Sequence, residues 1–251
     1  MYRICIDFGH GSFDPGAIGQ KGTLEKNINL QVGLKLTQKF IDNGFIIKLT
    51  RKSDNVTWNS KTDLQTRCDI ANNFNADIFI SIHCNSATNR SAYGAEVWTS
   101  VGETSSDVLA ERIIEKYKTI LPTQFVRVDM SDGDSDKEAN YYVLRNTKMT
   151  AVLVELAFIS NLEEEKLLND NDFQNKCVDT IYSGVCEYLG IKELLGMFTD
   201  INNSYAKDSI EKLGKMGIFK GNGDGKFRPK DKITREEMAI VLDKILKLLG
   251  K

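Results

Sequence analysis

Short apolar runs alternate with longer amphipathic segments over the first 190 residues of the chain. Short apolar runs between turn residues are typical of buried strands, whereas apolar residues three or four positions apart are typical of helices. The pattern predicts strands at Arg3–Phe8, Phe45–Thr50, Ile78–His83, Ala95–Thr99, Tyr141–Leu144 and Ala151–Leu156. It predicts helices at Glu25–Asp42, Leu64–Asn73, Ser106–Ile120 and Phe173–Leu189. This alternation predicts an α/β fold with a twisted, mostly parallel sheet that helices flank on both faces.

The pattern changes after Gly190, where a small helical C-terminal module is predicted. Its expected elements are a helix at Tyr205–Met216, a glycine-rich loop at Gly217–Gly225 and a helix at Arg235–Leu249. We therefore expect a first domain at residues 1–190, a linker at residues 191–197 and the module at residues 198–251.

Composition and charge narrow the class of protein. Hydrophobic residues make up 41% of the chain and charged residues 27%, which is ordinary for a globular protein. The apolar runs are shorter than the roughly 20 residues that a membrane helix needs, so we expect no membrane span. A formal net charge of −2 argues against a nucleic-acid partner. From Met197 onward, 12 Lys and Arg stand against 8 Asp and Glu, and this basic balance suggests an anionic partner for the module. The five cysteines lack C-x-x-C spacing and are expected to be reduced thiols.

The 2 histidines of the sequence, His10 and His83, each follow an apolar strand. Because parallel strands end at one edge of a sheet, the two rings could meet there, and two unrelated histidines at strand ends are the alternative. Glu25 begins the first helix, where the helix dipole alone also favours an acid. Glu155 ends an almost wholly apolar strand, and a carboxylate there needs a hydrogen bond, an opposite charge or a metal. Burial would raise its pKa and suit it to proton transfer near neutral pH.

The glycines around His10 exclude one alternative and suggest a role. The third glycine of a dinucleotide-binding G-x-G-x-x-G motif would fall on Asp14, which argues against that motif. Instead, the glycines permit a sharp turn that exposes His10, with Asp7 or a nearby carbonyl as the expected partner of its ring. Adjacent residues of a strand point to opposite faces, so the Cys84 side chain is expected to face away from the His83 ring. This argues against a cysteine hydrolase.

Several spaced motifs carry a family resemblance that runs in order across about 190 residues. They are D-F-G-H-G-x-x-D-P-G-A at Asp7–Ala17, G-x-x-E-K-x-x-N-L at Gly22–Leu30, L-T-R at Leu49–Arg51, S-I-H-x-N at Ser81–Asn85 and V-L-V-E-x-x-F-I-S-N at Val152–Asn161. Together they resemble the zinc-dependent N-acetylmuramoyl-L-alanine amidases of type 3.

The resemblance implies a metal site and a reaction. His10, Glu25 and His83 would bind one zinc ion per chain, and Glu155 would be the catalytic acid and base. The implied substrate is peptidoglycan, and the implied bond joins the lactyl group of N-acetylmuramic acid to L-alanine. Asn85 and Arg145 are candidate substrate contacts by position alone.

The tail carries a second resemblance. F-T-D at Phe198–Asp200, I-x-K-L-x-K-x-G-I-F-K-G-x-x-D-G-x-F-R-P at Ile210–Pro229 and I-T-R-E-E at Ile233–Glu237 resemble one S-layer homology module. Thr234 and Glu237 also predict a helix capping box, which does not need Arg235. The Arg235 guanidinium suits an acidic saccharide, and the resemblance implies an anionic secondary cell-wall polysaccharide as partner. The resemblance also implies that such modules usually come in threes, so a single copy implies either weak binding or a homo-oligomer.

The biological setting follows from these expectations. The N-terminal stretch lacks the basic, apolar and cleavage segments of a secretory signal. We therefore expect synthesis in the cytoplasm without a signal peptide and action at the bacterial cell wall after release, as for an endolysin or autolysin. The alternatives are a zinc peptidoglycan hydrolase of the carboxypeptidase type and a non-catalytic wall-anchored protein.

Overall fold

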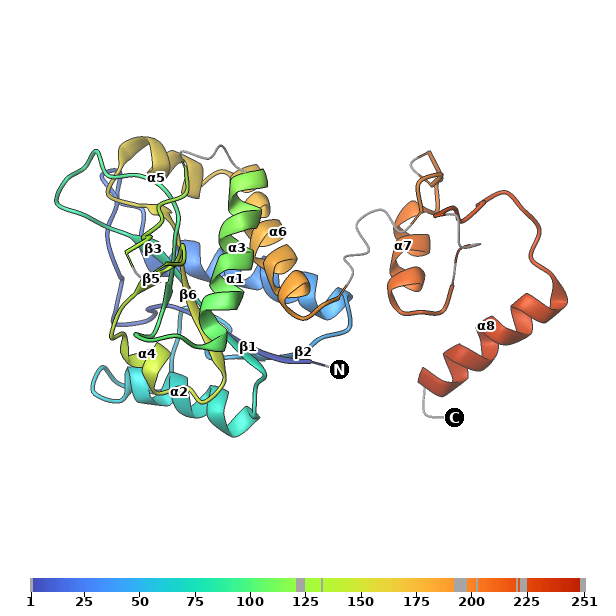
Figure 1. Ribbon diagram of the computed structural model, residues 1–251, viewed down its shortest axis with the longest axis horizontal. Helices are drawn as coiled ribbons and strands as arrows, with labels where there is room; N and C mark the ends of the chain where they lie inside the picture. The colour runs from blue at the N-terminus through green and yellow to red at the C-terminus, as the bar shows by residue number, and fades with distance from the viewer. Residues whose placement is uncertain are drawn as a thin grey trace. The chain divides into compact units, whose positions relative to one another are not determined.

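Six strands form one mixed sheet in the first part of the chain (Figure 1). The computed structural model describes residues 2–120, 125–131, 133–191, 198–201, 203–219, 221 and 225–248. Residues 2–41 and 45–191 make up a first compact unit, and the described residues after 197 belong to a second. The predicted linker at residues 191–197 lies outside the described residues except for Ile191.

The sheet has the order β2-β1-β3-β6-β4-β5. Neighbouring strands are parallel except that β4 runs antiparallel to β6. The strands are β1 (Arg3–Phe8), β2 (Ile46–Leu49), β3 (Ile78–Asn85), β4 (Glu96–Thr99), β5 (Lys137–Glu138) and β6 (Thr150–Phe158). The mostly parallel α/β sheet predicted from the sequence is confirmed.

Helices cover both faces of this sheet. The first unit contains α1 (Glu25–Asp42), α2 (Asp63–Phe74), α3 (Ser105–Ile120), α4 (Tyr142–Arg145), α5 (Leu162–Leu168) and α6 (Asn171–Tyr188). Helices α1, α3 and α6 pack on one face and form the larger core, and α2 and α4 pack on the other (Figure 1). Successive residues of β1 alternate accordingly, because Ile4 and Ile6 enter the larger core and Cys5 enters the smaller one.

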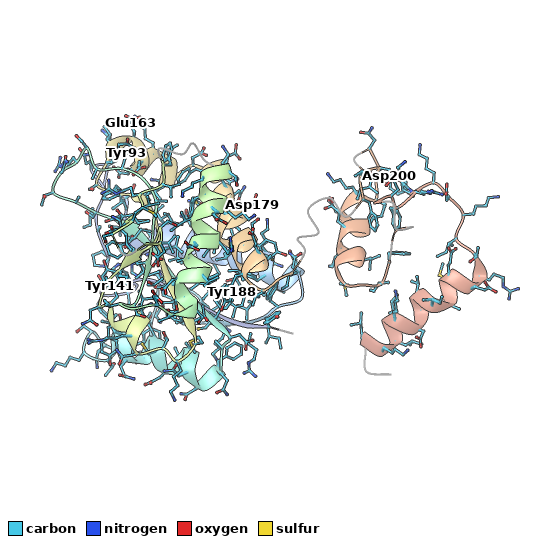
Figure 2. All side chains as sticks on the ribbon, in the orientation of Figure 1. Tyr93, Tyr141, Glu163, Asp179, Tyr188 and Asp200 are labelled. Atoms are coloured by element: carbon cyan, nitrogen blue, oxygen red, sulfur yellow. The ribbon has the colours of Figure 1, made fainter. Side chains whose placement is uncertain are left out.

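The predicted strand at Tyr141–Leu144 is wrong, because these residues lead into the single-turn helix α4. The backbone amides of Leu144 and Arg145 both donate to the carbonyl of Tyr141, 3.2 Å away, which is a helical pattern. Val143 and Leu144 are buried against α2, and the Tyr141 ring (Figure 2) packs edge-on against Trp98 at 5.5 Å between centroids. Apolar and aromatic residues therefore suited a buried helical turn as well as a strand.

Helix α5 is absent from the predicted elements, although a local signal marks its start. Asn161 Oδ1 accepts hydrogen bonds from the amides of Glu163 (3.0 Å) and Glu164 (3.3 Å), which is an N-cap. Three acidic residues in the first turn, residues 163–165, complement the helix dipole. Glu165 also accepts bonds from the amides of Lys21 and Thr23, so α5 secures the loop that leads into α1.

The second unit contains α7 (Lys207–Lys215) and α8 (Arg235–Leu248), close to the two predicted helices. Phe198, Ile201 and Ile210 form its small core. The capping box is confirmed, since the Thr234 amide donates to Glu237 Oε2 at 2.7 Å and the Glu237 amide donates to Thr234 Oγ1 at 3.1 Å. Leu249 and parts of the predicted loop at Gly217–Gly225 lie outside the described residues. In the part of the chain that the structure describes, every helix is too short or too polar to cross a bilayer.

Candidate metal centre

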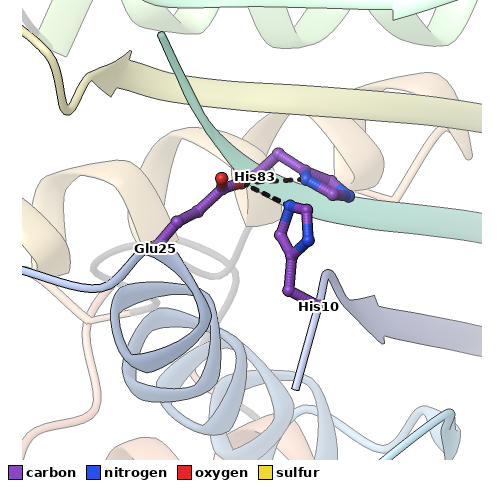
Figure 3. A group of neighbouring side chains, drawn as sticks. All are labelled: His10, Glu25 and His83. Carbon is purple, nitrogen blue, oxygen red and sulfur yellow. Dashed lines mark hydrogen bonds and ion pairs between the residues drawn. The ribbon is translucent and has the colours of Figure 1, made fainter. Parts of the chain in front are cut away.

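His10, Glu25 and His83 meet where the carboxyl ends of β1 and β3 approach the start of α1 (Figure 3). One ligand atom from each residue lies within 4.8 Å of the others. Glu25 Oε1 is 3.1 Å from His10 Nε2 and 3.0 Å from His83 Nδ1. The two imidazole rings meet edge to face with their centroids 4.9 Å apart. The three side chains singled out in the sequence are therefore brought together.

The orientation of His10 is set by Asp14. The backbone of His10 is left-handed, with φ of 64°, and its Nδ1 lies 2.6 Å from Asp14 Oδ2. A proton on Nδ1 therefore bonds to the carboxylate and leaves Nε2 directed at Glu25. We expected Asp7 or a carbonyl in this role, and the structure places Asp14 there instead. Asp14 belongs to the D-P-G stretch of the first motif.

Two glycines make room for the cluster. A Cβ on Gly9 would lie 2.2 Å from Cε1 of His83, so the His83 ring packs directly on the backbone of the first strand's end. A Cβ on Gly16 would lie 2.6 Å from Glu25 Oε2, and Gly16 also has φ of 65°. Any side chain at either position would displace a residue of the cluster.

Asp7 and Arg67 form a buried ion pair beneath the His10 loop. Arg67 Nη1 donates to Asp7 Oδ1 at 2.7 Å, and Arg67 Nη2 donates to the carbonyl of His10 at 2.7 Å. The hydroxyls of Thr50 and Ser81 also donate to Asp7, at 2.6 and 2.7 Å. Burial alone would raise the pKa of Asp7, but Arg67 and the two hydroxyls lower it to about 2. The pair therefore ties helix α2 to the backbone that carries His10.

We expect Asp7 to contribute to acid sensitivity of the fold. Its folded-state pKa of about 2 is below the ordinary 3.8, so its stabilisation is present above pH 4 and is lost as the pH falls through 2. The shift corresponds to about 2 kcal/mol. Asp7→Asn should lower the free energy of unfolding at pH 6 by about 2 kcal/mol, because Arg67 loses its buried partner and keeps, among the described residues, only the ion pair with Asp63 at 3.1 Å. Urea unfolding should show this difference narrowing between pH 4 and pH 2, and an unchanged difference would contradict the assignment.

Arg51, the arginine of the L-T-R motif, holds the same loop from the other side. Its Nε donates to the carbonyl of Phe8 at 2.8 Å, and its Nη2 donates to the carbonyls of Gly9 (3.0 Å) and Lys26 (2.7 Å). One guanidinium thus joins the end of β1 to the first turn of α1. The distance between His10 and Glu25 is fixed by these bonds as well as by the direct contact.

Glu25 is 3% exposed and is fully engaged at the first residue of α1. Its Oε2 accepts from the amide of Ala17 at 2.8 Å, and its Oε1 also accepts from the amide of Cys84 at 3.0 Å. Burial alone would raise the pKa of Glu25, but His10 and His83 hold it well below its usual range. The carboxylate is therefore charged, as a metal ligand must be.

Glu155 lies beside the cluster on the same face of the sheet. It is the register partner of His83 across the parallel β3–β6 pair, so the two side chains point the same way. Its Oε2 is buried and has no hydrogen-bond partner among the described residues. Burial, with Glu25 and Glu96 nearby, raises the pKa of Glu155 well above its usual range. A carboxyl in this state can hold a proton near neutral pH.

The three other sequence candidates lie in different surroundings. Asn85 ends β3 and donates from Nδ2 to Glu96 Oε2 at 2.6 Å. Arg145 is exposed at the end of α4, where Nη1 donates to Asn140 Oδ1 at 3.1 Å and the guanidinium lies over the Tyr142 ring. Arg235 is exposed at the first residue of α8 in the second unit. Their proposed contacts with substrate or polysaccharide stay predictions.

Sequence reasoning gave no role to Glu96, although it resembles Glu155 in its setting. Glu96 is 3% exposed at the start of the apolar strand β4 and is the register partner of Glu155 across the antiparallel β4–β6 pair. A carboxylate next to Val97 and Trp98 was the available signal. His83, Glu155 and Glu96 therefore form one row across three neighbouring strands.

Comparison with known families identifies the class of protein. The model of the N-acetylmuramoyl-L-alanine amidase family matches residues 4–187, and that of the S-layer homology domain matches residues 198–239. The chain therefore belongs to the N-acetylmuramoyl-L-alanine amidase family, and it carries an S-layer homology domain.

Individual relatives agree with this family. The N-acetylmuramoyl-L-alanine amidase LytC of Bacillus subtilis (strain 168) is 36% identical over 187 residues, which cover 74% of this chain and 35% of LytC. A putative N-acetylmuramoyl-L-alanine amidase of Buchnera aphidicola subsp. Acyrthosiphon pisum is 31% identical, with 74% of this chain and 93% of the relative covered. This chain thus matches about a third of LytC and nearly all of the Buchnera protein.

Solved structures share the fold of the first unit. The CwlD amidase of Clostridioides difficile, solved in complex with the GerS lipoprotein, superposes with a TM-score of 0.68 at 32% identity, covering 76% of this chain and 100% of CwlD. The catalytic domain of CwlV, an N-acetylmuramoyl-L-alanine amidase from Bacillus (Paenibacillus) polymyxa var. colistinus, gives 0.65 at 32% identity with the same two coverages.

Proposed function

We propose that this chain is a zinc-dependent amidase that cleaves peptidoglycan between the lactyl group of N-acetylmuramic acid and L-alanine. The observation that carries the proposal is the convergence of His10, Glu25 and His83 within 4.8 Å, with Glu155 next to His83 in the sheet register. Family membership supplies the bond that is cut.

The residues present fit a zinc ion. Two imidazole nitrogens and one carboxylate oxygen are a donor set of catalytic zinc sites, which keep a fourth position open. His10, Glu25 and His83 would hold the ion, with Asp14 orienting His10. When bound, zinc supplies Lewis-acid activation of the scissile carbonyl and of the attacking water.

Glu155 is the group that moves the proton. Its carboxylate accepts a proton from water as the water oxygen forms its bond to the carbonyl carbon. It then donates that proton to the alanine nitrogen as the carbon–nitrogen bond breaks, which leaves a carboxylic acid on the lactyl group and a free amine on the peptide. Glu155 Oε2 is buried and has no hydrogen-bond partner among the described residues, which supports a carboxyl that is available to water or substrate.

Mass spectrometry of digested walls tests the reaction. The proposal requires stem peptides with a free N-terminal L-alanine and glycan strands that keep their lactyl groups. Release of C-terminal alanine alone would identify a carboxypeptidase, and intact walls would identify a non-catalytic protein. Either result would overturn the proposed activity.

The S-layer homology domain directs this proposal to the cell wall. We assign Arg235 an ionic contact with an anionic secondary cell-wall polysaccharide, because its guanidinium is exposed at the start of α8. Helix α8 has no buried residue among those described, and three of its exposed apolar side chains, Met238, Leu242 and Leu246, recur every fourth residue and so lie along one side of the helix. We assign this surface to a second copy of the chain, since association would give the single module the multivalency that strong wall binding requires.

The chain should therefore sediment as a concentration-dependent oligomer, and Leu242→Lys should shift it towards monomer.

Wall pull-downs test both contacts. Leu242→Lys should weaken wall binding because multivalency is lost. Arg235→Ala should weaken it by about tenfold, because one charge-assisted bond is lost. The exposed-charge control is Lys61→Ala in the first unit. A concentration-independent monomer would remove the self-association proposal, and full wall binding by Arg235→Ala would remove the ionic one.

A further inference from the structure

Glu96 organises a cluster of donors one strand away from Glu155. Its Oε1 accepts from Arg127 Nε at 2.6 Å and from Lys137 Nζ at 2.8 Å. Its Oε2 accepts from Asn85 Nδ2 at 2.6 Å and from Trp98 Nε1 at 3.2 Å. One buried carboxylate therefore holds two cations and two neutral donors in fixed positions.

The two cations come from the outer edge of the sheet. The amide of Arg127 donates to the carbonyl of Ala95 at 2.9 Å, which attaches its segment to the start of β4. Lys137 lies in β5 and is the register partner of Trp98 in β4. Both side chains reach inwards to Glu96, which is itself the partner of Glu155. The row of side chains from His83 through Glu155 to Glu96 is thus followed by two cations, Arg127 and Lys137.

The pair carries more positive charge than Glu96 neutralises. Two cations bond to one carboxylate, and the Arg127 side chain is 42% exposed. Arg127 uses Nε for the bond to Glu96, and its two Nη groups bond to none of the described residues, so they can donate to another acceptor. The Arg127 guanidinium also lies 5.2 Å from the Phe158 ring centroid, and Lys137 Nζ lies 5.3 Å from that of Trp98. Both side chains are ordered in advance, so an incoming anion would cost little conformational entropy.

We propose that Arg127 and Lys137 form a subsite for a carboxylate of the stem peptide, with Glu96 as its positioning residue. The inference rests on the proposed function, in which Glu155 protonates the leaving nitrogen. The peptide then departs from the Glu155 side of the cluster, and β4 is the next strand on that side. Neighbouring strands are about 4.8 Å apart, and an extended peptide advances about 3.3–3.6 Å per residue. An acidic residue one or two positions beyond the scissile bond therefore reaches the basic pair, and D-glutamate as second residue of the stem supplies that carboxylate.

Paired ligands test the subsite directly. The probes are N-acetylmuramoyl-L-alanyl-D-glutamate with its γ-carboxyl capped as a methylamide, and the same compound with the α-carboxylate also converted to an amide. Binding is measured by calorimetry to zinc-loaded Glu155→Gln protein, so that the result does not depend on turnover. We expect a preference for the carboxylate of about 10- to 100-fold, from one or two charge-assisted bonds.

Arg127→Gln and Lys137→Gln should each reduce this preference at least severalfold, with affinity for the amide unchanged. Each variant keeps the other cation on Glu96, which protects the fold, and Lys118→Gln on the exposed side of α3 is the matched control that should keep the full preference. Equal affinity for both ligands, no binding of either, or full preference in both variants would overturn the subsite. Hydrolysis of the carboxylate compound by wild-type protein, followed in parallel, reports on the proposed function separately.

Discussion

Glu155→Gln should lower the rate constant of wall digestion by about 10²- to 10⁴-fold, the range of a lost general acid and base. The substitution keeps the size of the side chain and removes the group that we propose takes a proton from water and returns it to the leaving nitrogen. Glutamine cannot carry out either transfer. The fold should be unchanged, because Glu155 Oε2 makes no hydrogen bond among the described residues.

Metal content separates this effect from loss of the ion. Glu155→Gln protein should retain about one zinc per chain by atomic emission, while its KM for soluble wall fragments changes little. Glu163→Gln is the matched control, since that carboxylate is 76% exposed on α5 and should leave turnover at the wild-type value. Wild-type turnover by Glu155→Gln would assign the proton transfer to another residue.

His83→Ala should abolish both zinc binding and activity. The substitution removes one of the three proposed ligands, and the structure offers no other group of His, Cys, Asp or Glu in its described part that could replace the cluster. We expect the zinc content to fall from about one per chain towards zero after dialysis, and activity to fall to the level of chelator-treated wild type.

Cys84→Ala is the matched control for this variant. Cys84 follows His83 directly, but it is buried in the larger core on the opposite face of the sheet. The Cys84→Ala protein should retain zinc and activity, whereas a cysteine hydrolase would lose all activity with this substitution. Burial raises the pKa of the Cys84 thiol well above its usual range, which further disfavours a thiolate nucleophile.

The fold was predictable where burial leaves a local pattern. The runs at Ile78–His83 and Ala151–Leu156 are mostly apolar because β3 and β6 lie inside the sheet and are covered on both faces. The segment at Tyr141–Leu144 was misread because its burial comes from packing against α2, which one turn of helix achieves as well as a strand. The antiparallel direction of β4 depends on its pairing with β6, and no residue of β4 encodes it locally.

The candidate site was predictable where a polar residue interrupts or ends an apolar strand. His10, His83 and Glu155 all stand out in this way, and the structure brings them together with Glu25. Two residues near the site, Arg67 and Glu96, were not predictable, because their contacts join distant positions. Arg67 contacts Asp7 across 60 positions of the chain. The role of Glu96 depends on its hydrogen bonds to Arg127 and Lys137, which lie elsewhere in the sequence.

Diffraction from zinc-loaded crystals at the zinc absorption edge tests the central claim most directly. The account predicts one anomalous peak per chain, within about 2.0–2.2 Å of a nitrogen of His10, a nitrogen of His83 and an oxygen of Glu25. The Glu155 carboxyl should lie beside that peak without being one of its ligands. A peak held by other residues, or no peak at this cluster in fully loaded protein, would contradict the account.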